Sequence, residues 1–147
     1  MIQSILMVCM GNICRSPMAE ALLADKLKQV YPSVVVLSAG LGAMVDWPAD
    51  PIVQSFMTER GIDISAHRAR QATSTVLFDS ELVLTMSTDQ QEQIEQQYPS
   101  MQGRVHRLGK WGSFDIPDPY KRPKAIFEQS LVLIEQAVDE WYRTLWT

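Results

Sequence analysis

The chain has 147 residues, a hydrophobic share of 46% and a formal net charge of −4 at pH 7. This length predicts a single domain over residues 1–147, with enough apolar residues for a packed core that needs no disulfide or metal. The acidic balance argues against nucleic acid as a partner, because nucleic-acid-binding domains usually carry a basic face.

The start of the chain and its cysteines indicate a cytoplasmic protein. Residues 1–5 lead straight into an apolar strand pattern and lack the charged lead of a secretory signal. No apolar run approaches the roughly 18 residues that a membrane-spanning helix requires, so we expect no stable membrane insertion. The two cysteines, Cys9 and Cys14, stand in one short loop and are expected to be thiols in a reducing compartment.

The first elements predicted are a buried strand and a helix. Residues 2–9 contain a continuous apolar run, as central parallel strands do. After a loop of small and polar residues, Pro17 suits the first turn of a helix whose apolar positions continue to Leu27.

A second strand and helix follow. Residues 34–37 predict another buried strand, which ends at residues 38–40. Asp50 and Pro51 then have the form of an N-cap and a first helical residue, and this helix is expected to stop at Gly61.

The middle of the chain predicts a short helix, a strand and a polar helix. The helical turn covers residues 74–78 and the third strand residues 81–86. Ser87, with Gln90 three residues later, is a capping-box pattern for a helix that runs to Tyr98.

The remaining segments complete an alternating order of strands and helices. A fourth strand is predicted at 105–108, a long loop at 109–122 and a helix at 124–146. We therefore predict an α/β fold, a doubly wound, four-stranded parallel sheet with helices on both faces. Ligands bind beyond the carboxyl ends of the strands in such sheets, which is where Cys9 ends the first strand.

The loop after the first strand has the features of an anion-binding catalytic site. The free amides of the following helix and its dipole attract negative charge. Gly11 lets the backbone approach a ligand closely, and Arg15 supplies a planar charged group that suits two phosphate oxygens.

Cys9 is the expected nucleophile. Donors that hold a phosphate also favour the thiolate form of a cysteine among them, and the thiolate is the attacking species. The alternative is that Cys9 is a small buried residue at the end of a strand. Its spacing to Arg15, between a strand and a helix, favours the nucleophile.

These residues resemble the low-molecular-weight protein tyrosine phosphatases. The family signature is Cys, five residues, Arg, then Ser or Thr at the end of the first strand, with a distant Asp-Pro-Tyr. The chain has Cys9, Arg15 and Ser16 in this pattern, and Asp-Pro-Tyr at 118–120. Further similar segments are 38–40, 69–71 and 84–86. The resemblance covers essentially the whole chain and is closest to bacterial members linked to exopolysaccharide or capsule synthesis.

The resemblance implies metal-independent hydrolysis of phosphotyrosine without a cofactor. Cys9 attacks phosphorus and becomes a phosphocysteine, Asn12 holds the loop in shape, and Ser16 hydrogen-bonds the Cys9 thiolate. Arg15 and the loop amides bind the phosphate oxygens. The substrate-binding positions implied are Met10, Gly11, Asn12, Ile13, Cys14, Ser16 and Tyr120. The implied partner is an autophosphorylated bacterial tyrosine kinase, and we expect a monomer.

A phenolate leaves more readily if a carboxylic acid protonates it, so we expect one carboxyl that is mobile enough to reach the ester oxygen. The loop 109–122 offers Asp115 and Asp118, either of which could equally be a solvated turn residue. The resemblance selects Asp118 as the acid, and later the base toward water, and leaves Asp115 as a loop carboxylate.

The residues after Asp118 have alternative assignments. Tyr120 either flanks the substrate ring as an aromatic wall, which we favour, or packs within the loop. Family members often carry a second Tyr where this chain has Lys121. Lys121 and Arg122 could instead attract acidic residues around the phosphotyrosine.

Several other residues near the expected site keep open roles. His67 can reach the loop, although a structural or surface role is favoured. Met44 and Trp47 either line the cleft or pack beneath the loop. Cys14 is a candidate for a reversible disulfide with Cys9. Two His and two Cys in this arrangement fit no zinc spacing, so no metal is expected.

Three other functions fit the sequence less well. A thiol-dependent arsenate reductase uses a similar loop but needs further cysteines downstream, and none follows Cys14. A phosphoryl-carrier module would not need a leaving-group acid. A silent phosphotyrosine-binding module would not need Cys9, Arg15 and Asp118 together.

Overall fold

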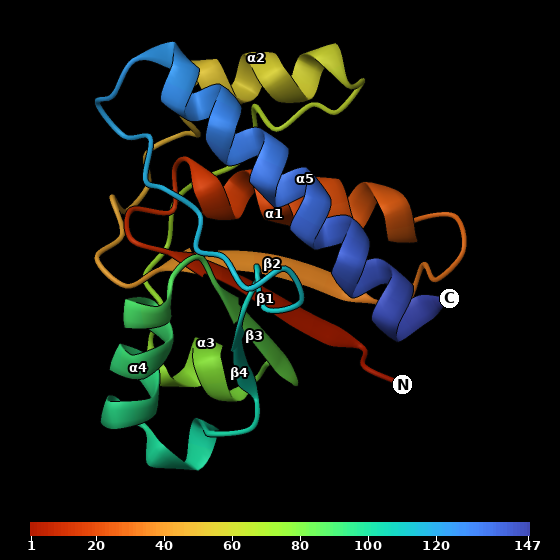
Figure 1. The fold of residues 1–147 in the computed structure, drawn as a ribbon, viewed down its shortest axis with the longest axis vertical. Coiled ribbons are helices and arrows are strands. Elements are labelled where there is room, and N and C mark those ends of the chain that lie inside the picture. The colour runs from red at the N-terminus through yellow and green to blue at the C-terminus, as the bar shows by residue number, and fades with distance from the viewer.

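The computed structural model describes residues 1–147 as a four-stranded parallel sheet in the order β2-β1-β3-β4 (Figure 1). The strands are β1 (Ser4–Cys9), β2 (Val35–Gly40), β3 (Leu82–Thr85) and β4 (Val105–Arg107). The helices are α1 (Arg15–Leu27), α2 (Pro51–Glu59), α3 (Ser74–Phe78), α4 (Thr88–Gln97) and α5 (Lys124–Trp146), with a 3₁₀ turn η1 (Pro99–Met101). In Figure 1, α1, α2 and α5 cover one face of the sheet, and α3 and α4 lie on the other. The predicted doubly wound α/β fold is confirmed.

The helix boundaries follow local signals in the sequence. The Asp50 carboxylate accepts a hydrogen bond from a first-turn N–H of α2 at 2.9 Å, and Gly61 has a φ of 74° just beyond the helix end. The Ser87 hydroxyl accepts from the Gln90 N–H at 3.3 Å and caps α4. The Gln90 side chain accepts from the Met86 N–H instead of closing the capping box on Ser87. Every helix is too short or too polar to span a bilayer.

The second strand ends within the predicted residues but differs from the prediction in burial. β2 continues through Gly40, and Val35 and Leu37 are 49% and 43% exposed. Leu37 pairs in register with Leu6, so both side chains face the side of α3 and α4. Because α3 has only five residues and α4 packs against β3 and β4, the start of this edge strand stays open to solvent. The prediction of a buried second strand was therefore wrong for its first half.

β1 is the central strand that positions the site. Ile5, Met7 and Cys9 belong to the core cluster on the side of α1 and α5, whereas Leu6 and Val8 belong to the cluster on the other face. Each of these side chains is at most 2% exposed. Packing on both faces fixes the end of β1, from which the loop to α1 departs.

Candidate active site

The predicted loop joins the central strand directly to a helix. Cys9 is the last residue of β1 and Arg15 the first of α1, and they are 2% and 5% exposed. Pro17 lies in the first turn of α1, where the helix needs no N–H from it. The predicted order of strand, loop and helix is confirmed.

The carbonyl groups of the loop accept hydrogen bonds from the segments around it. The carbonyls of Cys9, Met10, Gly11 and Ile13 accept from the backbone N–H groups of Leu41, Gly42, Met44 and Asp50 respectively, at 2.9–3.0 Å. No protein acceptor takes the N–H groups of Gly11, Ile13 or Cys14. With the carbonyls turned outward, these N–H groups face into the loop. Successive inward N–H groups form a concave site for an anion.

Asn12 holds the loop in a left-handed turn. Its φ is 59°, a conformation that asparagine tolerates better than most residues. Its side-chain amide donates to the hydroxyls of Ser16 at 2.8 Å and Ser38 at 2.9 Å, and its Oδ1 accepts from the Arg70 N–H at 3.0 Å. Asn12 is completely buried, so these three bonds give both amide N–H groups and the Oδ1 a partner where water does not reach.

The close packing around the loop falls on Gly40 rather than on Gly11. A Cβ at Gly40 would lie 2.5 Å from the carbonyl oxygen of Met10 and 3.1 Å from the backbone nitrogen of Asn12. A Cβ at Gly11 would meet only side-chain atoms, at 3.6 Å or more. Glycine is therefore required at the end of β2, where the strand lies against the loop.

Two donors reach the sulfur of Cys9. The Asn12 N–H donates to Sγ at 3.3 Å, and the Ser16 hydroxyl lies 2.9 Å from it. The Ser16 oxygen already accepts from the Asn12 amide, which leaves its own proton available for the sulfur. Donors aimed at the sulfur stabilise a thiolate in preference to a thiol.

Arg15, which lines the loop, has one buried donor without a partner. Its Nη1 donates to the Ile116 carbonyl oxygen at 2.9 Å, and its Nη2 lies 3.5 Å from Oδ2 of Asp118. Its Nε is buried and has no partner. A buried donor without a partner is costly, and a guanidinium binds oxyanions through its planar N–H groups. The Nε of Arg15 therefore favours a bound anion.

Only one of the two candidate acids faces the loop. Asp118 has a side chain that is 51% exposed, and its Oδ1 accepts from the Tyr120 N–H at 3.1 Å. Asp115 is bound instead by Thr88 and Arg107, away from the cavity. Asp118, and not Asp115, is thus placed beside Arg15.

A cavity of about 180 Å³ opens over the loop. It is lined by Cys9, Met10, Gly11, Ile13, Cys14, Arg15, Gly42, Met44, Asp118 and Tyr120. Asn12 and Ser16, which the sequence also predicts to contact substrate, are absent from this lining and support the loop from behind. The cavity combines buried anion-binding groups with an apolar wall, which suits an aryl phosphate.

Comparison with known proteins agrees with this geometry. The sequence model of a family described as low molecular weight phosphotyrosine protein phosphatase matches residues 4–147. The chain belongs to this family. It is a protein-tyrosine phosphatase.

Individual relatives are similar over nearly the whole chain. The phosphatase is 48% identical over 141 residues to the "Probable low molecular weight protein-tyrosine-phosphatase EpsP" of Ralstonia solanacearum, covering 96% of this chain and 94% of that one. The crystal structure of the tyrosine phosphatase AmsI from Erwinia amylovora matches with a TM-score of 0.92 and 36% identity, covering 100% and 95%. The tyrosine phosphatase Wzb from Escherichia coli K30, solved in complex with sulphate, matches with a TM-score of 0.90 and 37% identity, covering 99% of each chain.

Three residues that support the phosphatase loop were not assigned from the sequence. His67 has its Nε2 2.8 Å from the Asn12 carbonyl oxygen, so it reaches the loop, which was the less favoured of its two roles. Ser38 and Arg70 bind the Asn12 side chain. Both lie in segments that resemble the family, but no local pattern indicated that they would meet Asn12.

The second cysteine of the phosphatase is buried and stays protonated. Burial raises the pKa of the Cys14 thiol well above its ordinary value, and the negative charges of Asp50, Cys9 and Asp118 act in the same direction. Both Cys9 and Cys14 are free thiols in this structure. The disulfide between them stays a prediction.

The remaining candidates divide between the cavity and the surface. Met44 lines the cavity, whereas Trp47 is 52% exposed and outside the lining.

His106 lies beside Trp141 and Lys110, and burial followed by the Lys110 charge lowers its pKa. No group of three or more His, Cys, Asp or Glu side chains is arranged to hold a metal ion.

Proposed function

We propose that the phosphatase hydrolyses phosphotyrosine in two steps through a phosphocysteine at Cys9. The observation that carries this mechanism is the convergence of Cys9, Arg15 and Asp118 in the lining of one cavity, with the Arg15 Nε buried and unpaired. Positioning and charge stabilisation supply most of the catalysis of phosphoryl transfer, and this arrangement offers both.

In the first step the Cys9 thiolate attacks phosphorus. The bond from phosphorus to the tyrosine oxygen breaks, and protonated Asp118 gives its proton to that oxygen. The inward N–H groups of the loop and the Arg15 guanidinium hold the equatorial oxygens of the phosphoryl group. A phenol with a pKa of about 10 is a poor leaving group as its anion, so this proton lowers the barrier.

In the second step water attacks the phosphocysteine. Asp118, now a carboxylate, takes a proton from the water, the sulfur–phosphorus bond breaks, and inorganic phosphate leaves. The Cys9 thiolate is restored, with the Ser16 hydroxyl 2.9 Å away to stabilise it. The same carboxyl serves both steps, and the enzyme returns to its starting protonation state.

The apolar wall of the cavity supports an aromatic substrate. Met10, Met44 and Tyr120 line the cavity around the deeper Cys9 and Arg15. A tyrosine side chain would place its ring among these groups and its phosphate on the loop. Phosphoserine is shorter and has no ring to fill this wall.

We infer that the physiological substrate is an autophosphorylated bacterial tyrosine kinase of polysaccharide synthesis or export, dephosphorylated in the cytoplasm by a monomeric enzyme. Support comes from the resemblance, over essentially the whole chain, to bacterial family members linked to exopolysaccharide or capsule synthesis.

Kinetics of an aryl phosphate in metal-free buffer test the mechanism. Wild type should hydrolyse it, Cys9→Ser should lose all measurable activity, and Asp118→Asn should lose about 10²–10⁴-fold on a poor leaving group. Full activity in Cys9→Ser would end the proposal. Phosphotyrosine, phosphoserine and phosphoarginine peptides of one sequence test the substrate class, and equal turnover of all three would overturn the tyrosine preference.

A further inference from the structure

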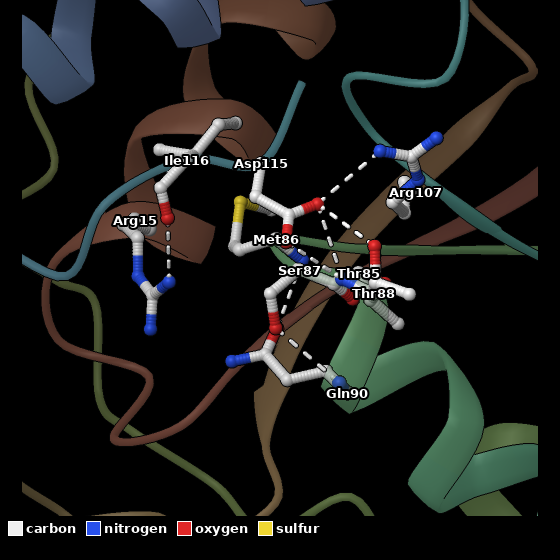
Figure 2. A network of polar contacts seen from close by, with 9 residues as sticks. All are labelled: Arg15, Thr85, Met86, Ser87, Thr88, Gln90, Arg107, Asp115 and Ile116. Carbon is white, nitrogen blue, oxygen red and sulfur yellow. Dashed lines mark hydrogen bonds and ion pairs between the residues drawn. The ribbon is translucent and has the colours of Figure 1, made fainter. Parts of the chain in front are cut away.

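The carboxylate of Asp115 is held by two elements outside the cavity. Its Oδ1 and Oδ2 accept from the Thr88 N–H at 3.1 and 3.2 Å. Its Oδ1 also accepts from the Thr88 hydroxyl at 3.1 Å and from Nη1 of Arg107 at 3.3 Å (Figure 2). Thr88 begins α4 and Arg107 ends β4. Asp115 therefore ties the segment before α5 to the carboxyl-terminal edge of the sheet.

Asp115 caps one first-turn N–H of α4, that of Thr88, and Ser87 caps another. The Ser87 hydroxyl accepts from the Gln90 N–H, and Asp89 places an acidic side chain in the first turn. The Asp115 bonds therefore join the loop to α4 as well as capping the helix.

The two residues after Asp115 are also fixed. The Ile116 N–H donates to the Met86 carbonyl at 2.9 Å, and the Ile116 carbonyl accepts from Arg15 (Figure 2). The Pro117 carbonyl accepts from the hydroxyl of Ser130, which is completely buried, at 2.8 Å. The backbone that leads into Asp118 is thus held by hydrogen bonds at both Ile116 and Pro117.

We propose that Asp115, held by Thr88 and Arg107, is a positioning residue for the general acid. This inference rests on the role proposed for Asp118. Without the Asp115 bonds the acid segment loses the first of its anchors on the N-terminal side, and the resulting shift displaces Asp118 from the leaving oxygen. Ile116 keeps its bonds to Met86 and Arg15, so phosphate binding persists.

The dependence of kcat/KM on the leaving group tests this role. Asp115→Asn and Arg107→Gln should each lower kcat/KM for phenyl phosphate about 10-fold, because a small misplacement of a catalytic group is costly. For 2,4-dinitrophenyl phosphate, whose leaving group needs no proton, the change should be less than about twofold, as should the change in inhibition by inorganic phosphate. The matched control is Asp89→Asn, which removes one negative charge from the helical turn that Asp115 contacts without touching the acid segment. It should behave as wild type.

Asp118→Asn separates the two proposals. If kcat/KM of this variant depends on the leaving group no more steeply than kcat/KM of wild type, the acid role of Asp118 fails. If it does, but Asp115→Asn and Arg107→Gln keep the wild-type dependence, the positioning role alone is overturned. Equal losses on both substrates, with weaker phosphate inhibition, would also overturn it, because they would indicate general damage to the loop. Adding Asp115→Asn to Asp118→Asn should steepen the dependence no further, since both act through one group.

Discussion

Arg15 donates a hydrogen bond to the carbonyl oxygen of Ile116 at 2.9 Å, across 101 positions in the sequence. This bond joins the residue at the start of α1 to the segment that carries Asp118. The same guanidinium lies 3.5 Å from the Asp118 carboxylate and keeps its Nε unpaired. This contact therefore holds the anion-binding group beside the segment of the proposed acid.

Replacing Asn12 should destabilise the loop through both its bonds and its backbone. Asn12→Ala loses the hydrogen bonds to Ser16, Ser38 and Arg70 and keeps an unfavourable φ, so the free energy of unfolding should fall by about 2–4 kcal/mol. Asn12→Gly loses the same bonds but tolerates the left-handed turn, and should be about 1 kcal/mol more stable than Asn12→Ala. Urea denaturation measures both. Equal stability of the two variants would show that the φ of 59° carries no cost.

Gly40→Ala should impair catalysis although Gly40 lies outside the cavity. The new Cβ would collide with the Met10 carbonyl at 2.5 Å and force the loop to move, so kcat/KM should fall about 10-fold or more. Gly42→Ala is the comparison, because its Cβ would meet only the flexible Met10 Sδ, at 3.1 Å. A larger loss in Gly42→Ala than in Gly40→Ala would contradict the packing argument.

His106 should make the phosphatase less stable in mild acid. Burial, followed by the Lys110 charge, lowers its pKa in the folded state below the unfolded value of about 6.5. As pH falls through 6.5, the unfolded chain gains a proton that the folded chain resists, so the stability contributed by neutral His106 is present above that pH and is lost below it. His106→Gln should therefore lose less unfolding free energy than wild type between pH 7.5 and 5.5. A parallel decline in the two proteins would contradict this role.

Local patterns in the sequence predicted much of the fold and the reacting groups. The strand that ends at Cys9, the helices at 74–78 and 124–146, and the caps at Asp50 and Ser87 depend on neighbouring residues, and the structure confirms them. The cavity brings together Cys9, Arg15 and Asp118, whose roles still await the experiments above.

The features that the sequence did not predict depend on distant contacts. Val35 and Leu37 are exposed because β2 is an edge strand. A run of apolar residues predicts a strand but does not show whether that strand lies at the edge or in the centre of the sheet. His67 meets the loop across 55 positions. Asp115 and Asp118 are equivalent as loop carboxylates until their partners are known, and one of those partners, Thr88, comes from the start of α4.

The central claim is that phosphate passes through Cys9, and trapping the intermediate tests it most directly. Asp118→Asn should still be phosphorylated by 2,4-dinitrophenyl phosphate, which needs no acid, but should hydrolyse the phosphocysteine slowly for lack of a base. Acid quenching within milliseconds, followed by peptide mapping by mass spectrometry, should find one phosphoryl group on Cys9, matching a burst of dinitrophenol. A burst with no phosphoryl group on Cys9, or with the group on another residue, would contradict the mechanism.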